Sequence, residues 1–209
     1  MKASITRLRL AAAAAELFYA HGITASGVDA VVLRAGVSKP TLYSHYQSKA
    51  DLVTAALEFQ HHTRRQAVEE FLRARSDLSP HERLLSVFDW LQTWYSEQGT
   101  RGCAFLNAAA ELVDPQDEPA RKIVQRHKRW WRELFIQLAK EGGVTRSREL
   151  ADGLLLLVDG VSSRVLVMGE AGAASTARQL ADILWWHYRD PASTSPGTGN
   201  RGSDPGVDA

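Results

Sequence analysis

The chain has 209 residues, of which 44% are hydrophobic and 23% charged, and its formal net charge is +1. These proportions are those of an ordinary globular protein, so they exclude a globally disordered chain and a membrane-spanning one. The single cysteine, Cys103, excludes an intrachain disulfide and favours a reducing compartment. Glu16 and His21 interrupt the alanine-rich start, so we interpret it as a helix and not a signal peptide, and we expect a cytoplasmic protein.

The charges are unevenly distributed along the chain. Residues 1–50 contain six Lys or Arg residues and two acidic residues, an excess of four positive charges. The remainder is slightly acidic. A positive excess on one short segment predicts an anionic partner.

Helical periodicity runs through most of the chain, and no alternating strand pattern is found, which predicts an all-α fold. Glycine and proline breaks separate helices predicted over residues 5–21, 28–35, 39–46, 49–75, 81–98, 104–112, 119–142, 147–169 and 175–189. Residues 190–209 are rich in Pro, Gly and Ser with almost no apolar content, so we expect a disordered tail there.

The stretch AGVSKPTLYSHYQSKADL, which starts at Ala35, has the residues of a tight turn between two short helices. Gly36 lies where the first helix must reverse, a position that favours positive φ. Ser38 can cap the next helix, and Pro40 suits its first turn. This spacing is typical of a helix-turn-helix. Residues 1–50 are therefore predicted to form a three-helix DNA-binding domain, followed over residues 51–189 by a larger helical domain.

The second helix of this motif has one apolar face and one polar face. Leu42 and Tyr46 lie on the inward face at helical spacing. The opposite face suits the major groove, where Pro40 and Thr41 would meet base edges and the other side chains phosphates. Ser26, a predicted cap of the preceding helix, would aim free N–H groups at another phosphate. The predicted DNA-binding residues are Ser26, Ser38, Lys39, Pro40, Thr41, Tyr43, His45 and Lys49.

The segment GITASGVDAVVLRAGVSKPTLYSHYQSKADLV, Gly22 to Val53, strongly resembles the DNA-binding domain of TetR-family transcriptional regulators. The resemblance includes the AGVSKPTLYSHY core and the following SK-x-x-L. The sequence departs from the family pattern at Gly27, where serine or threonine is commoner, and at Val31, where isoleucine is usual. The resemblance implies that the larger domain dimerises and binds a small effector that changes the separation of two DNA-reading heads.

Aromatic residues in the larger domain are the candidates for an effector pocket. The predicted ligand-binding residues are Trp94, Phe105, Asn107, His127 and Trp131. The alternative is that most of these aromatic side chains only fill the core, as aromatic stripes at helical spacing usually do. Because few charged residues accompany these candidates, we expect a small, mostly apolar effector.

Two C-terminal helices are candidates for a dimer interface. Residues 150–167, LADGLLLLVDGVSSRVLV, are apolar on nearly all sides, so this helix must be buried on every face. With residues 180–186, it is predicted to form a four-helix interface with the same helices of a second copy. Trp185 and Trp186 are expected in that interface or in the neighbouring core.

Three further features have competing interpretations. Cys103 is either a thiol sensor or a small apolar residue at a helix start, and the second interpretation is favoured. His61 and His62 are adjacent, hence on different sides of a helix, and make a poor metal pair. The basic residues within 126–132 alternate with Trp, which favours a solvated helix face over a second nucleic-acid patch.

The sequence therefore predicts a homodimeric, ligand-responsive transcriptional repressor that binds double-stranded DNA at a short palindrome. We predict no catalytic residue, metal site or cofactor, since the chain has no nucleophile elbow, phosphate-binding loop or metal motif. An effector-independent architectural DNA-binding protein is the alternative. The excess of four positive charges is modest for binding that depends on phosphates alone.

Overall fold

The computed structural model describes residues 2–189, with side chains from residue 4 onward. The predicted tail over residues 190–209 lies outside the described residues. Residues 2–189 contain helices and no strand, which confirms the all-α prediction. Within this range, no helix is long and apolar enough to span a membrane.

The helices follow the predicted order, and their ends differ from the predicted ends by three residues or fewer. They are α1 (Lys2–His21), α2 (Val28–Ala35), α3 (Lys39–His45), α4 (Lys49–Arg73), α5 (Pro80–Glu97), α6 (Ala104–Glu111), α7 (Glu118–Glu141), α8 (Ser147–Met168) and α9 (Ala173–Arg189). A short 3-10 turn, η1 (Pro115–Asp117), was not predicted.

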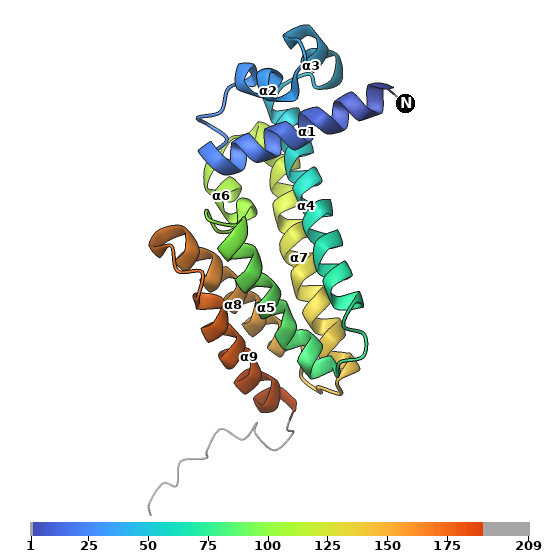
Figure 1. Ribbon diagram of the computed structural model, residues 1–209, viewed down its shortest axis with the longest axis vertical. Coiled ribbons are helices and arrows are strands. Elements are labelled where there is room, and N and C mark those ends of the chain that lie inside the picture. Colours follow the sequence, from blue (N-terminus) through green and yellow to red (C-terminus); the bar gives the residue numbers. More distant parts are fainter. Residues whose placement is uncertain (1, 190–209) are drawn as a thin grey trace, which may run out of the picture.

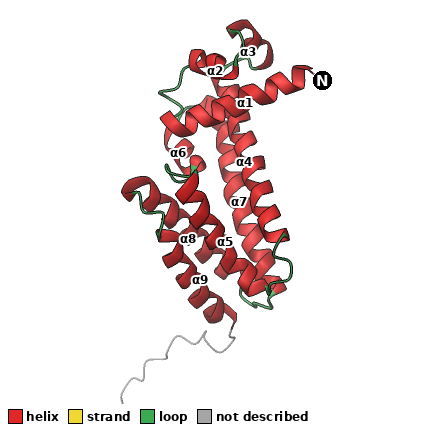
Figure 2. Cartoon of the chain, in the orientation of Figure 1, coloured by secondary structure: helices red, strands yellow, loops and turns green. Residues whose placement is uncertain are grey.

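The helices form a small head and a long helical body (Figure 1). The head consists of α1, α2 and α3, and α1 lies across one end of the body. The body contains α4 to α9. Within it, α4 and α7 lie side by side, α8 packs against α7, and α9 packs against both α8 and α5. Figure 2 shows that the connecting loops are short compared with the helices. The layout of a three-helix head and a larger helical domain is thus confirmed.

The head has its own apolar core, which α4 completes. Leu10 of α1, Val31 of α2 and Leu42 of α3 are all fully buried in one cluster. Leu52 and Ala56 of α4 belong to the same cluster. Because α4 continues without interruption into the body, the predicted division near residue 50 cuts through a helix, and we keep it as a proposal.

The core of the body is formed mainly by α5, α7, α8 and α9. Phe88 and Phe135 are fully buried and stack with ring centroids 6.2 Å apart. Val68 and Leu72 bring the second half of α4 into the same cluster. Trp185 of α9 is 1% exposed, as expected for a core residue.

Candidate DNA interface and ligand cavity

The turn between α2 and α3 has the predicted geometry. Gly36 adopts φ 61°, and the N–H of Val37 donates to the Val32 carbonyl at 3.0 Å, which ends α2 in a left-handed cap. Ser38 caps α3, because its Oγ accepts from the backbone N–H of Thr41 at 3.3 Å. The turn therefore fixes the direction in which α3 leaves α2.

The α3 helix is anchored on one side and exposed on the other. Leu42 is 0% and Tyr46 3% exposed, and the Tyr46 hydroxyl donates to the Arg7 carbonyl of α1 at 2.9 Å. Of the predicted DNA-binding residues, Ser38, Lys39, Pro40 and Tyr43 are exposed, whereas Thr41, His45 and Lys49 are half-buried. The structure thus brings these seven side chains to the head around α3.

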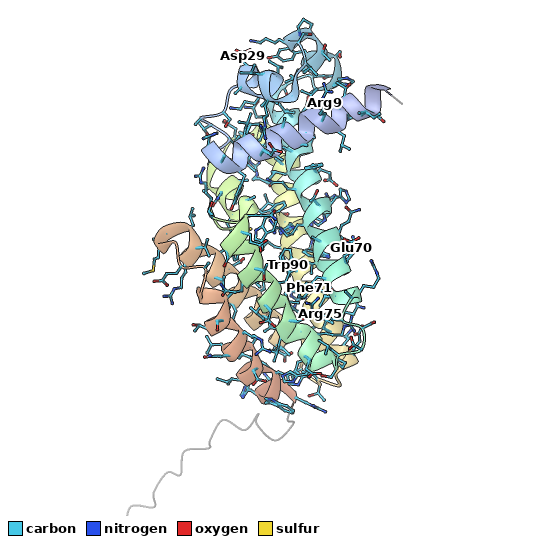
Figure 3. All side chains as sticks on the ribbon, in the orientation of Figure 1. Arg9, Asp29, Glu70, Phe71, Arg75 and Trp90 are labelled. Atoms are coloured by element: carbon cyan, nitrogen blue, oxygen red, sulfur yellow. The ribbon has the colours of Figure 1, made fainter. Side chains whose placement is uncertain are left out.

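Both predicted phosphate-binding lysines have partners within the chain. Lys39 Nζ lies 2.9 Å from Oδ1 of Asp29, and the hydrogen bond and charge of that carboxylate raise the pKa of Lys39. Lys49 Nζ donates to the Thr24 carbonyl at 3.4 Å. Asp29 lies at the head end of the molecule (Figure 3). A phosphate at Lys39 would therefore compete with Asp29.

Ser26 does not cap α2, so that prediction is wrong. The N-cap of α2 is Gly27, which has no side-chain cap. Ser26 is 5% exposed, and its Oγ donates to the carbonyls of Gly22 at 2.7 Å and Leu17 at 3.3 Å. The hydroxyl is turned inward toward these carbonyls at and just after the end of α1, so it is not available to a phosphate.

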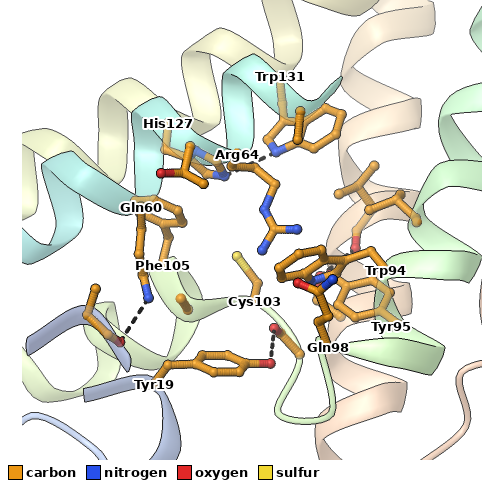
Figure 4. Close-up of a pocket in the computed structure, with 18 of the residues that line it drawn as sticks. Tyr19, Gln60, Arg64, Trp94, Tyr95, Gln98, Cys103, Phe105, His127 and Trp131 are labelled. Atoms are coloured by element: carbon orange, nitrogen blue, oxygen red, sulfur yellow. Dashed lines mark hydrogen bonds between the residues drawn. The ribbon is translucent and has the colours of Figure 1, made fainter. Parts of the chain in front are cut away.

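A cavity of about 250 Å³ lies where the body meets α1 of the head. Figure 4 shows this space between α1, α4, α5, α7 and the loop before α6. Its lining includes the predicted Trp94, Phe105, His127 and Trp131, together with Tyr19 and Tyr95. The lining is therefore mainly apolar and rich in aromatic rings.

Asn107 does not line this cavity, contrary to its prediction as a ligand-binding residue. Its Nδ2 donates to the Arg101 carbonyl at 2.9 Å, and it borders a separate void of about 20 Å³. The residue lies two positions beyond Phe105 on the short α6, and this rotation of about 200° around the helix axis carries it away from the large cavity. Its amide holds the loop before α6.

Two buried histidines lie at one side of the cavity. His127 lines the cavity, and His61 contacts His127 from behind. His127 Nε2 accepts from Trp131 Nε1 at 3.1 Å, so its own proton lies on Nδ1, 3.2 Å from Nδ1 of His61. Burial lowers the pKa of His127 well below its ordinary value, with a smaller effect from Lys128. Burial also lowers the pKa of His61. Both rings are therefore neutral at neutral pH, and the ring of His127 stacks on Phe105 at 3.6 Å between centroids.

Arg64 of α4 is a cavity residue that the sequence analysis missed. Its guanidinium carbon lies 3.3 Å from the Trp94 ring centroid and 5.2 Å from that of Trp90. A signal was present in the sequence, because Arg64 continues the series of buried α4 positions Leu57, His61, Val68 and Leu72 at helical spacing.

The loop before α6 connects the cavity to the head. The Tyr19 hydroxyl of α1 donates to the Gly102 carbonyl at 3.1 Å and accepts from the Arg101 N–H at 2.9 Å. At the end of α6, Glu111 accepts from the N–H groups of Ile23 at 3.0 Å and Thr24 at 2.7 Å. The loop before α6 is thus bonded to the end of α1, and the end of α6 to the segment that leads into α2.

The remaining candidates are also placed by the structure. Cys103 is the half-buried N-cap residue of α6 and lines the cavity, 3.9 Å from Lys128 Nζ. In the basic run, Arg126 pairs with Glu58, Lys128 with Asp159, and Arg132 with Asp152. These ion pairs count against a second nucleic-acid patch, and Lys128 belongs to the cavity lining and not to a solvated face.

Comparison with known proteins gives two matching family models. The model for bacterial regulatory proteins of the tetR family matches residues 10–56, and a tetracyclin repressor-like C-terminal domain model matches residues 80–181. The chain is also 36% identical over 155 residues to the HTH-type transcriptional activator FasR of Mycolicibacterium smegmatis, which covers 72% of this chain and 68% of that protein.

Solved structures share the same fold. A TetR-family transcriptional regulator from Streptomyces coelicolor aligns with a TM-score of 0.77 at 26% identity and covers 90% of this chain and 97% of its own. A TetR transcriptional regulator from Chloroflexus aurantiacus aligns with a TM-score of 0.75 at 22% identity, covering 87% and 94% respectively. At 22% identity, the likeness to the Chloroflexus aurantiacus protein shows only a shared fold.

Proposed function

Because the chain belongs to the TetR family of DNA-binding transcriptional regulators, we propose that it binds a palindromic operator as a homodimer and releases it when a small effector fills the cavity. The observation that carries the proposal is the α3 helix, which is anchored by Leu42 and Tyr46 and presents Lys39, Pro40 and Tyr43 to solvent. This is the geometry that a major-groove helix requires.

The operator can be found by selection from random duplexes with the purified protein, followed by gel-shift titration. We expect an inverted repeat whose half-sites are about one helical turn apart, or a multiple of that distance. Recovery of unrelated sequences without any shared repeat would contradict the proposal and would favour an architectural DNA-binding protein.

Exposed apolar residues on α8 and α9 support the dimer. Along α8, Leu156, Gly160, Ser163 and Val167 form one exposed stripe at helical spacing. Leu156 is 74% and Val167 77% exposed, and on α9 Ile183 is 64% and Trp186 52% exposed. In a single chain these helices are therefore not buried on every face, and pairing with a second copy would cover them.

The position of the cavity supports a response to an effector. Tyr19 of α1 is part of the lining, and the same helix forms the floor of the head through Leu10. A ligand that binds the DNA-incompetent arrangement more tightly shifts the population toward it. We propose that the effector is small and mostly apolar, because most of the lining is apolar and much of it is aromatic.

The direction of regulation depends on where the operator lies relative to the promoter. We propose repression in the cytoplasm by occlusion of the promoter, although the relative from Mycolicibacterium smegmatis is named an activator. A reporter driven by the natural promoter decides between the two: deletion of the regulator raises expression under repression and lowers it under activation.

A further inference from the structure

Among the charged residues that line the cavity, Arg64 is the one with no oppositely charged partner in the described part of the chain. Its side chain is half-buried, and Figure 4 shows its guanidinium pointing into the space between Trp94 and Cys103. Burial lowers the pKa of Arg64 to about 10, so the side chain is still positively charged at neutral pH. A cation is thus held at the cavity, partly removed from bulk water.

No acidic side chain in the described part of the chain pairs with Arg64. The one carboxylate in the cavity lining is Glu16, and it binds Arg34, with 2.9 Å between its Oε2 and Nε. The other cation of the lining, Lys128, is paired with Asp159. A buried charge without a counter-charge is costly, and the face of Trp94 offsets only a part of that cost.

Most other polar groups of the lining are already bonded within the chain. The Tyr95 hydroxyl lies 2.6 Å from Ser162 Oγ, and Gln60 Nε2 donates to the Ala15 carbonyl at 3.1 Å. Trp131 donates to His127, as described above. Arg64 is therefore the group with the most unused hydrogen-bonding capacity toward a ligand, since a guanidinium carries five N–H donors.

We propose that Arg64 binds the carboxylate of a small apolar monocarboxylic acid, whose body lies among the aromatic rings of the cavity. This inference rests on the proposed effector role of the cavity and specifies its ligand. The planar guanidinium matches a carboxylate in a two-point contact. One unpaired positive charge balances one negative charge, whereas a phosphate monoester, with a charge of about −1.5 to −2, would leave charge uncompensated in a desolvated site.

The first test compares acids with their matched neutral amides on the full-length wild-type protein without DNA. Calorimetric titrations use 2-naphthoate, indole-3-acetate and octanoate beside 2-naphthamide, indole-3-acetamide and octanamide. We expect at least one acid to bind about tenfold or more tightly than its amide, because hydrogen bonds to charged groups are the stronger ones. The proposal is overturned if no acid binds with a Kd below about 1 mM, or if every amide matches its acid.

The second test changes the cation. Arg64→Met should weaken binding of the preferred acid about tenfold or more while changing binding of its amide little, and Arg64→Lys should fall between. Arg65→Met is the matched control, because Arg65 is exposed and pairs with Glu69 at 2.6 Å outside the cavity. Unchanged acid binding by Arg64→Met would overturn the proposal. If Arg64→Met does not fold, the acid and amide comparison on wild type and Arg64→Lys decides.

The two proposals fail separately. A protein that binds its operator but prefers amides to acids contradicts the role of Arg64 and leaves the regulator proposal standing. A protein that prefers acids through Arg64, yet keeps the same operator affinity when saturated with them, contradicts the effector response and leaves the acid site standing.

Discussion

We propose that individual side chains of the head divide between base recognition and phosphate binding. Thr41 Oγ1 lies 2.8 Å from Ser38 Oγ at the start of α3, and we expect Thr41 to meet a base edge. Lys49 lies at the start of α4, outside α3, and we expect it to bind a phosphate. The two residues should therefore respond differently to substitution.

Thr41→Val keeps the shape of the side chain and removes its hydroxyl. We expect a loss of about 1–3 kcal/mol at the cognate base and a relaxed preference at that operator position, measured by titrating single-base operator variants. Lys49→Ala should instead weaken binding to all sequences and reduce the slope of log affinity against log salt by about one. Equal losses on specific and random DNA for both variants would contradict this division.

The buried histidine His127 makes stability depend on pH. Its pKa is lowered in the folded state by burial, so below about pH 6.5 the unfolded chain binds a proton that the folded chain does not. Above about pH 6.5, His127 therefore does not reduce the free energy of unfolding. Below that pH the free energy of unfolding falls, by up to about 1.4 kcal/mol per pH unit for each such group.

Urea unfolding between pH 8 and pH 5 measures this effect. His127→Gln, which keeps an acceptor for Trp131, should show a shallower decline toward low pH than wild type. His62→Gln is the control, because His62 is 63% exposed in its side chain and lies outside the cavity. Equal declines in wild type and His127→Gln would refute the assignment.

What the sequence can predict at this scale depends on how local the interaction is. Gly36 and Ser38 act through neighbours within five residues, so their roles followed from the residue types. Ser26 and Arg64 depend on what other helices place beside them: carbonyls at the end of α1 for Ser26, and the rings of α5 for Arg64. Residue types alone do not carry that information.

At the scale of elements, the contact between α6 and the segment before α2 is one of those that join the body to the head. Partial burial alone would raise the pKa of Glu111, but the N–H groups of Thr24 and Ile23 lower it overall. The carboxylate is therefore ionised where it holds these two N–H groups. Gly22 is also close, because a Cβ there would lie 3.2 Å from Oε1 of Glu111.

Glu111→Gln should loosen this contact, since a neutral amide replaces the charged acceptor. We expect the amides of Ile23 and Thr24 to exchange with deuterium about tenfold faster, read by NMR or peptide mass spectrometry. Glu118→Gln serves as control because Glu118 is exposed at the start of α7. Unchanged exchange at both amides would show that the contact does not order this segment.

The helices themselves were predicted well, because each has a clear apolar period and a glycine, proline or serine at its ends. The capping box of α5, in which Ser79 and Glu82 satisfy each other, is such a local signal. The 3-10 turn η1 was missed, since three residues are too few to show a period. The orientation of α6, which excludes Asn107 from the large cavity, is set by tertiary packing.

At the scale of the whole molecule, the proposed dimer depends on the exposed stripes of α8 and α9. Leu156→Glu combined with Ile183→Glu places charges in the centre of that surface and should give a monomer in analytical ultracentrifugation. Operator affinity should fall at least tenfold, because one head then binds without its partner.

Val113→Glu is the matched control for the dimer test. Val113 is 79% exposed, but it lies in the loop after α6, away from both stripes. It should leave the mass and the operator affinity unchanged. A dimer that survives the double substitution would place the interface elsewhere.

The continuous α4 helix limits how such proteins can be recombined. It carries Ala56 in the core of the head, Arg64 at the cavity and Leu72 in the core of the body. Inserting one residue between Ala56 and Arg64 would turn the head by about 100° and move it about 1.5 Å along the helix axis. A chimera that joins this head to the body of another regulator must therefore preserve the α4 register. A junction chosen only by the domain boundary would rotate the two heads of the proposed dimer away from their half-sites on the operator.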